Sequence, residues 1–367
     1  MVKPFHLLFT GSLVGLSAIS GLLLLLYHCA PVLYYLCTGI LLGSVGYCLV
    51  LYLAPKSRVN GNGKAVFITG CDSGFGFGLA KRLDSLGFTV FAGCLLADSG
   101  GEGEKKLRAE CSSRLSTVQI DVTDDGQVKA AVQQVKNSLP TESEGLYALV
   151  NNAGVWQPGE IEWVSIAAYR RVMEVNTFGT LRVTKAFLPL IRRAKGRVVN
   201  VTSAEGLHST PTVSAYCMTK AALESFSDAL RHEMHKWGVK VIIVEPGSFG
   251  PATNIALPGV YQVQGGNLRN SIEEVVKKDY GMEYFDFKKA ELRTLDDEGA
   301  TDPSPVIDVL ADAVTLTTPS HRYLVGSSFE DYVTWMWLGH FPTRWTDSTE
   351  GNDKEGDPKP AMLPKTN

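Results

Sequence analysis

Three side chains near the middle of the chain are suited to moving a proton. Ser203 closes a predicted strand, Tyr216 follows thirteen residues later near the start of a predicted helix, and Lys220 lies one helical turn beyond it in the segment YCMTK. Residues four apart share one face of a helix, so the phenol and the ammonium group should lie side by side. A free tyrosine, with a pKa of about 10, is a poor base at neutral pH, but a nearby cation lowers that pKa. The trio could therefore accept a proton from a bound substrate or return one to it.

The segments around these residues alternate between strands and helices. Nearly continuous β-branched and apolar runs predict buried strands at residues 65–69, 88–93, 115–121, 147–151, 196–202 and 239–246. The intervening stretches predict helices at residues 75–86, 125–138, 165–194 and 214–237. This alternation predicts an α/β fold of the Rossmann type, a doubly wound parallel sheet. The carboxyl ends of such strands face one crevice, so Ser203 and the segment NNAG (151–154) should border the same site.

A glycine-rich bend follows the first predicted strand. Gly70, Gly74 and Gly76 are spaced GxxxGxG where the strand passes into a helix. Backbone without Cβ can turn tightly and approach a pyrophosphate, and the free N–H groups of the next helix attract phosphate. In the first strand–helix unit of a parallel sheet, this pattern predicts a dinucleotide site.

The second and third predicted strands bear on which dinucleotide binds. Residues 94–100 contain no arginine or lysine that could hold a 2′-phosphate, and Asp98 is the nearest acid. We therefore expect NAD rather than NADP as the cofactor. Asp121 ends the third predicted strand, where it could meet the adenine amine or serve as a helix N-cap or turn residue.

Together these segments resemble the short-chain dehydrogenase/reductase family over roughly residues 62–325. The resemblance rests on six motifs in order: TGCDSGFG, NNAG, EVNTFG with Asn176, Ser203, YCMTK and EPG. It implies an oxidoreductase that interconverts a secondary alcohol and a ketone, with Asn176, Ser203, Tyr216 and Lys220 as catalytic residues. In the family, Ser203 would hydrogen-bond the substrate oxygen, and Asn176 would hold a water that links the lysine to solvent. The implied cofactor-binding residues are Thr69, Gly70, Ser73, Gly74, Phe75, Gly76, Asp121, Asn152, Ala153, Gly154, Tyr216, Lys220, Pro246 and Gly247.

One threonine departs from the family pattern. Family members often carry a threonine four residues after PG that touches the cofactor, whereas Thr253 lies six residues after Gly247. This spacing puts a role for Thr253 in holding the carboxamide in doubt.

Within the family, the chain is similar to membrane-associated D-3-hydroxybutyrate dehydrogenase through CDSGFGFGLAK, FAGCL, AFLPLIRRAKGRVVN, KDYG and TDPSPVID. That similarity implies D-3-hydroxybutyrate and acetoacetate as substrates. Membrane 17β-hydroxysteroid and retinol dehydrogenases share much of the pattern, which implies a steroid or retinoid instead. We expect residues 248–300 to cover the substrate, and Ser203, Tyr216 and His208 to contact it. His208 would pair with a substrate carboxylate, unless it is an ordinary loop histidine.

Another class of function stays open, a membrane protein that senses NAD(H) without turnover. Such a protein would keep the glycine loop but would not need Tyr216 with Lys220. A third hypothesis is that the protein is chiefly a membrane scaffold. A chain that starts near residue 60 would test it, because a pure scaffold should show no NAD-linked activity.

Two uncharged stretches precede the dehydrogenase-like region. Residues 7–27 and 31–53 each supply the roughly 20 apolar residues that a helix needs to cross a bilayer. We expect residues 1–53 to form a transmembrane helical hairpin, rather than a cleaved leader and a single span. Positive residues at both outer ends would place the catalytic domain on the matrix side of the mitochondrial inner membrane or the cytosolic side of the endoplasmic reticulum. The remaining predicted boundaries are a linker at 54–63, a catalytic domain at 64–345 and a disordered polar tail at 346–367.

The bulk composition excludes several partners. The formal net charge of −3 gives no general attraction to nucleic acid. The seven cysteines include no CxxC, which disfavours a disulfide framework or a zinc site, and we expect no metal. The expected partners are a small alcohol or ketone, membrane lipid and further copies of the chain in a homo-oligomer.

Overall fold

The computed structural model describes residues 27–28, 31–53, 57–253, 255, 272–297, 299–340 and 358–363. The chain divides into two compact units, Met1–Ser57 and Arg58–Asn367, each of which is described by itself. In the first unit, the second uncharged stretch forms one helix, α2 (Pro31–Leu53). The first stretch, apart from Tyr27, lies outside the described residues. Among the described helices, none has both the length and the apolar character needed to span a bilayer, so the hairpin stays a prediction.

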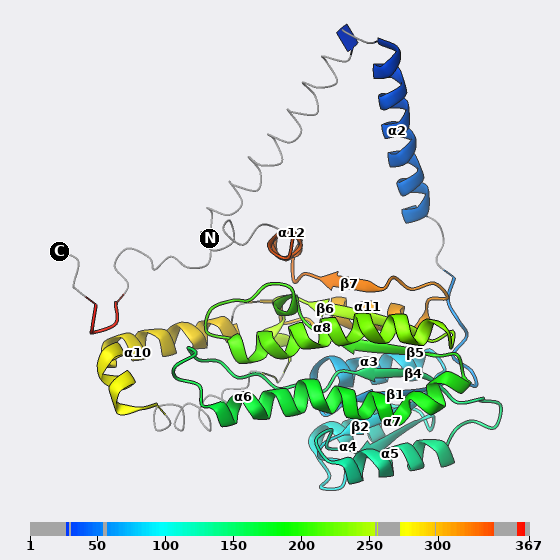
Figure 1. The fold of residues 1–367 in the computed structure, drawn as a ribbon. Helices are drawn as coiled ribbons and strands as arrows, with labels where there is room; N and C mark the ends of the chain where they lie inside the picture. The colour runs from blue at the N-terminus through cyan, green and yellow to red at the C-terminus, as the bar shows by residue number, and fades with distance from the viewer. Residues whose placement is uncertain are drawn as a thin grey trace. The chain divides into compact units, whose positions relative to one another are not determined.

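The second unit is built on a seven-stranded parallel sheet (Figure 1), which confirms the α/β fold of Rossmann type. Its strands, in the spatial order β3-β2-β1-β4-β5-β6-β7, are β1 (Ala65–Thr69), β2 (Thr89–Cys94), β3 (Leu115–Gln119), β4 (Leu146–Asn151), β5 (Arg197–Val201), β6 (Lys240–Pro246) and β7 (Arg322–Val325). The six predicted strands are all present, with ends shifted by at most two residues. The winding direction reverses between β1 and β4, so the carboxyl ends of these neighbours form the switch point where ligands bind in such sheets.

Helices cover both faces of the sheet because successive strand residues point to opposite sides. Val66 and Ile68 of β1 pack in the core beneath α3 (Gly74–Ser85), α4 (Glu102–Glu110) and α11 (Ser304–Thr315). Phe67, between them, faces the other layer and stacks on Phe187 with 4.5 Å between ring centres. That layer consists of α5 (Asp125–Asn137), α7 (Thr180–Arg193) and α8 (Ser214–His235). Burial on both faces explains why the strands are apolar throughout.

The long helix predicted at 165–194 is three elements in the structure. It runs as α6 (Ile166–Met173), a π-helical segment η1 (Glu174–Gly179) and then α7. Asn176 lies in the π-helical segment. Such interruptions within helices are frequent at functional sites.

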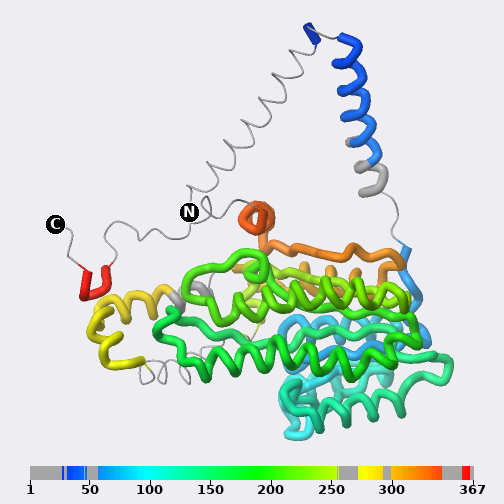
Figure 2. Tube along the Cα trace, in the orientation of Figure 1, coloured from blue at the N-terminus to red at the C-terminus, as the bar shows by residue number. Residues whose placement is uncertain are grey.

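Two further helices of the described residues follow β6 in the chain, and the first of them is drawn in yellow in Figure 2. They are α10 (Glu274–Asp297), which bends at Gly281, and α12 (Phe329–Leu338), while short 3-10 turns η2 (Ala204–Gly206) and η3 (Gly250–Ala252) follow β5 and β6. Tyr284 and Phe285 of α10 form a small aromatic cluster with Trp163. Much of the region predicted to cover the substrate, residues 254 and 256–271, lies outside the described residues.

Both predicted borders of the catalytic domain make backbone contacts with it. Val59, within the predicted linker, donates its N–H to the carbonyl oxygen of Thr315 at 2.8 Å. In the predicted tail, the N–H groups of Ala361 and Met362 donate to carbonyl oxygens of α10 at Tyr280 and Asp279, each at 2.9 Å.

Candidate active site

A cavity of about 780 Å³ opens at the carboxyl ends of the strands. It extends from the glycine loop after β1, past the ends of β4 and β5, to the segment after β6. The predicted site residues that line it are Gly70, Ser73, Gly74, Phe75, Asp121, Asn152, Ala153, Gly154, Ser203, Tyr216, Lys220, Pro246 and Gly247. Thr69, Gly76, Asn176 and His208 are not among the lining residues. The structure thus brings the predicted cofactor loop and the predicted proton-transfer residues to one cavity.

The glycine loop is shaped by close backbone contacts. Gly70 and Gly74 have φ angles of 70° and 60°, which favour glycine. A Cβ at Gly76 would lie 2.4 Å from the carbonyl oxygen of Gly70, so a side chain there would displace the loop. Gly76 therefore acts behind the cavity wall and allows α3 to begin directly beneath the loop.

Thr69 and Asn152 lock the glycine loop to the end of β4. The Thr69 hydroxyl accepts from the backbone N–H groups of Asn152 and Ala153, both at 3.0 Å. The Asn152 amide donates to the carbonyl oxygens of Thr69 and Gly70 at 3.0 and 3.1 Å. These bonds cross the switch point, so the two walls of the crevice hold a fixed separation.

The loop fits a dinucleotide pyrophosphate. The N-cap residue of α3, Ser73, makes no side-chain hydrogen bond to the first turn, which leaves N–H groups of that turn for a phosphate. Asp121 also lines the cavity, and its Oδ1 accepts from the N–H and hydroxyl of Thr123 at 2.8 and 2.7 Å. Asp121 is thus a turn residue that faces the cavity, while Asp124 is the N-cap of α5.

Ser203, Tyr216 and Lys220 meet at the other end of the cavity. Ser203 is 6% exposed just after β5, and Tyr216 and Lys220 occupy successive turns at the start of α8. Lys220 Nζ lies 5.3 Å from the centre of the Tyr216 ring and donates to the carbonyl oxygen of Val201 at 2.9 Å. The pairing expected from the four-residue spacing is therefore present.

Burial governs the protonation of these groups. It raises the pKa of Tyr216, a hydrogen bond with Ser203 lowers it, and the charge of Glu205 raises it further. Burial lowers the pKa of Lys220 to about 8, against which the nearby Glu224 carboxylate acts. Burial therefore outweighs the hydrogen bond from Ser203 and keeps the phenol protonated at neutral pH. The expected lowering of its pKa has to come from Lys220 together with a cationic nicotinamide.

Asn176 supports the site from within the core. Its Oδ1 accepts from the backbone N–H of Val155 at 2.8 Å, and its Nδ2 donates to the carbonyl oxygen of Val155 and to the Thr219 hydroxyl at 2.9 and 3.0 Å. The π-helical segment thereby links the residue after the NNAG segment to α8, the helix that carries Tyr216 and Lys220. The role of Asn176 in holding a water stays a prediction.

His208, which the sequence predicts to contact the substrate, is not among the residues that line the cavity. Its ring centre is 6.4 Å from that of Trp335, which does line the cavity. Contact between His208 and a substrate stays a prediction. Thr253, placed in doubt by its spacing, lines the cavity beside the glycine loop, where a Cβ on Gly74 would be 3.5 Å from its own Cβ.

Three acids that line the cavity, Asp72, Glu174 and Glu205, were not singled out from the sequence. Glu205, two residues after Ser203, accepts from the Thr210 hydroxyl at 3.0 Å and from Cys217 Sγ at 3.1 Å. Asp72 lies inside the glycine motif. Each of these acids lies two residues in sequence from a recognised motif residue, and this proximity could have marked it as a candidate site residue. Trp335 of α12 gave no such signal, because it comes from more than a hundred residues away.

Comparisons with known proteins agree with this geometry. A family model described as short chain dehydrogenase matches residues 64–258. Mitochondrial D-beta-hydroxybutyrate dehydrogenase of Mus musculus is 47% identical over 78% of this chain and 83% of its own length. Estradiol 17-beta-dehydrogenase 2 of Mus musculus is 43% identical over 81% of this chain and 77% of its own. A solved short-chain dehydrogenase from Streptomyces avermitilis is 27% identical, covers 78% of this chain and 94% of its own, and superposes with a TM-score of 0.58.

Proposed function

The chain belongs to the short-chain dehydrogenase/reductase family, and from this premise we propose that it is an NAD-dependent dehydrogenase interconverting a secondary alcohol and its ketone. An oxidoreductase acting on CH–OH groups follows from the family itself. The observation that carries the proposal is the meeting of Ser203, Tyr216 and Lys220 at one end of a cavity whose other end is the glycine loop.

In alcohol oxidation, Ser203, Tyr216 and Lys220 would each have a separate role. Ser203 hydrogen-bonds the substrate oxygen, and the Tyr216 phenolate takes the hydroxyl proton as general base. Lys220, held by the carbonyl oxygen of Val201, keeps its positive charge beside the phenolate and stabilises it. A bound oxidised nicotinamide supplies the hydride acceptor. In the reverse direction the Tyr216 phenol returns the proton to the ketone oxygen.

D-3-hydroxybutyrate and acetoacetate are the first substrate pair that we propose. Support comes from the 47% identity to a relative named for that activity. A bound carboxylate needs a cationic or N–H partner, because burying it alone is costly. His208, beside the cavity residue Trp335, is the partner that we propose.

A neutral, apolar alcohol, either a secondary one as in a steroid or a primary one as in retinol, is the second candidate, and Glu205 favours it. Glu205 follows Ser203 by two residues and lines the cavity. Its negative charge would repel a substrate carboxylate bound there. The cavity lining also includes the apolar side chains of Trp156, Val213, Phe249 and Trp335. The 43% identity to an estradiol dehydrogenase agrees with this candidate.

One panel decides between the two substrates. Detergent-solubilised protein with added phospholipid is assayed with NAD and with NADP against D-3-hydroxybutyrate, estradiol and all-trans-retinol. We expect NAD-linked oxidation of hydroxybutyrate. Oxidation of estradiol or retinol at micromolar concentration, with none of hydroxybutyrate at millimolar, would select the neutral alcohol and leave the hydride-transfer mechanism standing. If retinol, a primary alcohol, is the substrate, the product is an aldehyde rather than a ketone. Turnover of none of the three with either cofactor would contradict the proposal.

We also propose that the N-terminal region holds the enzyme on a membrane, with the mitochondrial inner membrane or the endoplasmic reticulum as the site. This rests on the uncharged stretches 7–27 and 31–53 and, for mitochondria, on the name of one relative. Extraction of membranes with alkaline carbonate tests it. The full chain should stay in the pellet, and its release into the supernatant would contradict anchoring.

A further inference from the structure

The glycine loop carries an acid that reaches across to the end of β2. Asp72 Oδ2 accepts from the backbone N–H of Leu95 at 2.8 Å, and Oδ1 accepts from that of Leu96 at 3.1 Å. Both Asp72 and Leu95 line the cavity. In dinucleotide-binding sheets the adenosine ribose lies at the end of the second strand, so the Asp72 carboxylate borders the ribose position.

The carboxylate is fixed there by its surroundings. Gln119 Nε2 donates to the carbonyl oxygen of Leu95 at 2.8 Å, which holds the turn after β2 against β3. A Cβ on Gly103 would lie 2.0 Å from the carbonyl oxygen of Asp72, so the start of α4 packs directly on the loop. Each carboxylate oxygen accepts one N–H in this arrangement and can accept a further hydrogen bond.

The charges around this corner are unfavourable for a phosphate. Among the described residues, the cations that line the cavity are Arg171 of α6 and Lys220 of α8, and neither belongs to the glycine loop or to the turn after β2. Lys105 and Lys106 of α4 do not line it. Asp98, the acid nearest the strand end in sequence, does not line it either, and its N–H donates to Gln119 Oε1 at 3.0 Å.

We propose that Asp72 is the residue that selects NAD over NADP. Its carboxylate accepts a hydrogen bond from the ribose 2′-hydroxyl of NAD and repels the 2′-phosphate of NADP. The acid therefore comes from the glycine loop rather than from the strand end where dinucleotide-binding sheets usually carry it. The inference rests on the proposed NAD dependence and names the group responsible for it.

The test measures cofactor binding without any alcohol substrate. Dissociation constants for NADH and NADPH are obtained from quenching of tryptophan fluorescence for the wild type, Asp72→Asn, Asp72→Ser and the matched control Asp98→Asn. We expect both Asp72 variants to lower the preference for NADH by at least about tenfold, mainly by tighter NADPH binding. Asp98→Asn should leave the preference within about twofold of the wild type.

Each alternative gives a different result. If Asp72 only braces the turn after β2, both cofactors weaken by the same factor and the thermal midpoint falls, which would overturn the proposal. If Asp98→Asn lowered the preference for NADH as much as the Asp72 variants do, the net negative charge of this region would explain the selection. That result would also overturn the proposal. A wild type that already prefers NADPH contradicts the proposed NAD dependence itself, before any variant is measured.

Discussion

At the scale of single residues, the site combines a proton-transfer trio with an acid beside it. Tyr216 is surrounded by groups with opposite effects on its pKa: burial and Glu205 raise it, and Ser203 lowers it. Glu205 is held by Thr210 and Cys217, so its charge has a fixed place in the cavity. It should therefore influence both the base and any charged substrate.

The first prediction concerns Glu205→Gln. The change removes a negative charge near the bound substrate but keeps an oxygen that can accept from Thr210. For hydroxybutyrate, kcat/KM should rise by about tenfold relative to its value for a neutral alcohol such as estradiol, an effect of roughly 1.4 kcal/mol. With both substrates, the pH–rate profile should also move to lower pH, because the Tyr216 pKa falls. Steady-state kinetics over a pH series measures both effects. An unchanged substrate ratio would show that Glu205 does not face the substrate carboxylate.

The sequence could predict residues whose relation is local and not those brought together by packing. Tyr216 and Lys220 lie one turn apart on any helix, and Gly70 and Gly74 belong to one bend, so their roles could be inferred from spacing. Asp72 could not be preferred over Asp98, because only the packing of the loop against β2 shows which carboxylate enters the cavity.

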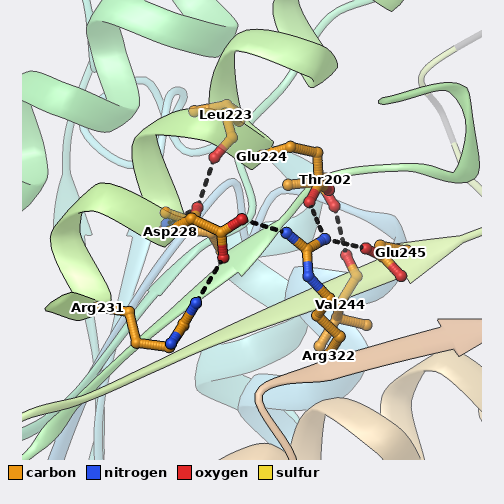
Figure 3. Close-up of polar contacts among 10 residues, drawn as sticks. Thr202, Leu223, Glu224, Asp228, Arg231, Val244, Glu245 and Arg322 are labelled. Carbon is orange, nitrogen blue, oxygen red and sulfur yellow. Dashed lines mark hydrogen bonds and ion pairs between the residues drawn. The ribbon is translucent and has the colours of Figure 1, made fainter. Parts of the chain in front are cut away.

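At the scale of elements, helix α8, which carries Tyr216 and Lys220, is attached to the sheet by a partly buried ionic cluster (Figure 3). Arg322 of β7 contacts Glu224 of α8 and lies 2.7 Å from both Glu245 of β6 and Asp228 of α8. Glu224 and Glu245 are 6% and 3% exposed. Since Glu224 lies one turn beyond Lys220, the cluster fixes the part of α8 that carries this lysine.

Such longer-range features explain what the sequence patterns left out. β7 is only four residues long and begins with an exposed arginine. It therefore lacks the apolar run that predicted the other strands, and it was not predicted from the sequence. α4 is mostly charged, and only Leu107 anchors it in the hydrophobic core. The π-helical segment at Asn176 is set by contacts with Val155 and Thr219 rather than by helix propensity, so the pattern predicted one regular helix.

The second prediction uses the protonation of this cluster. Burial raises the pKa of Glu245 to about 7, and the neighbouring Glu224 carboxylate adds to the rise, while Arg322 opposes it. The folded protein thus binds a proton that the unfolded chain, with a glutamate pKa of about 4.3, releases at lower pH. The stabilisation is complete below about pH 4 and is lost as the pH rises through about 7.

Comparison with Glu245→Gln measures this contribution. Relative to the variant, the wild type should lose thermal stability between about pH 5 and pH 8, because glutamine stays neutral throughout. The measurement is the difference in thermal midpoint at a series of pH values, with Asp98→Asn as an exposed-acid control. A difference that stays constant, or that grows in favour of the wild type as pH rises, would contradict the raised pKa.

At the scale of the whole molecule, one cavity collects residues from distant parts of the chain. The glycine loop follows the first strand, Ser203 follows the fifth, and Trp335 arrives from α12 near the end of the described residues. The parallel order of the sheet makes this possible, since every strand ends at the same edge. The glycine loop and the proposed proton-transfer residues lie on different segments, so we expect mutation to affect cofactor binding and proton transfer separately.

The replacement Tyr216→Phe tests the central claim most directly. It removes only the phenolic hydroxyl, while the glycine loop and NNAG segment remain intact. Tyr169→Phe is the matched control, because its hydroxyl lies 2.5 Å from Ser214 Oγ at the start of α8 and Tyr169 is not among the residues lining the cavity. With saturating substrate and NAD, Tyr216→Phe should lower kcat by at least about a hundredfold, with the NADH dissociation constant within about threefold of the wild type. Tyr169→Phe should keep most of the activity. A Tyr216→Phe enzyme with more than about a hundredth of wild-type turnover would contradict Tyr216 as the general base.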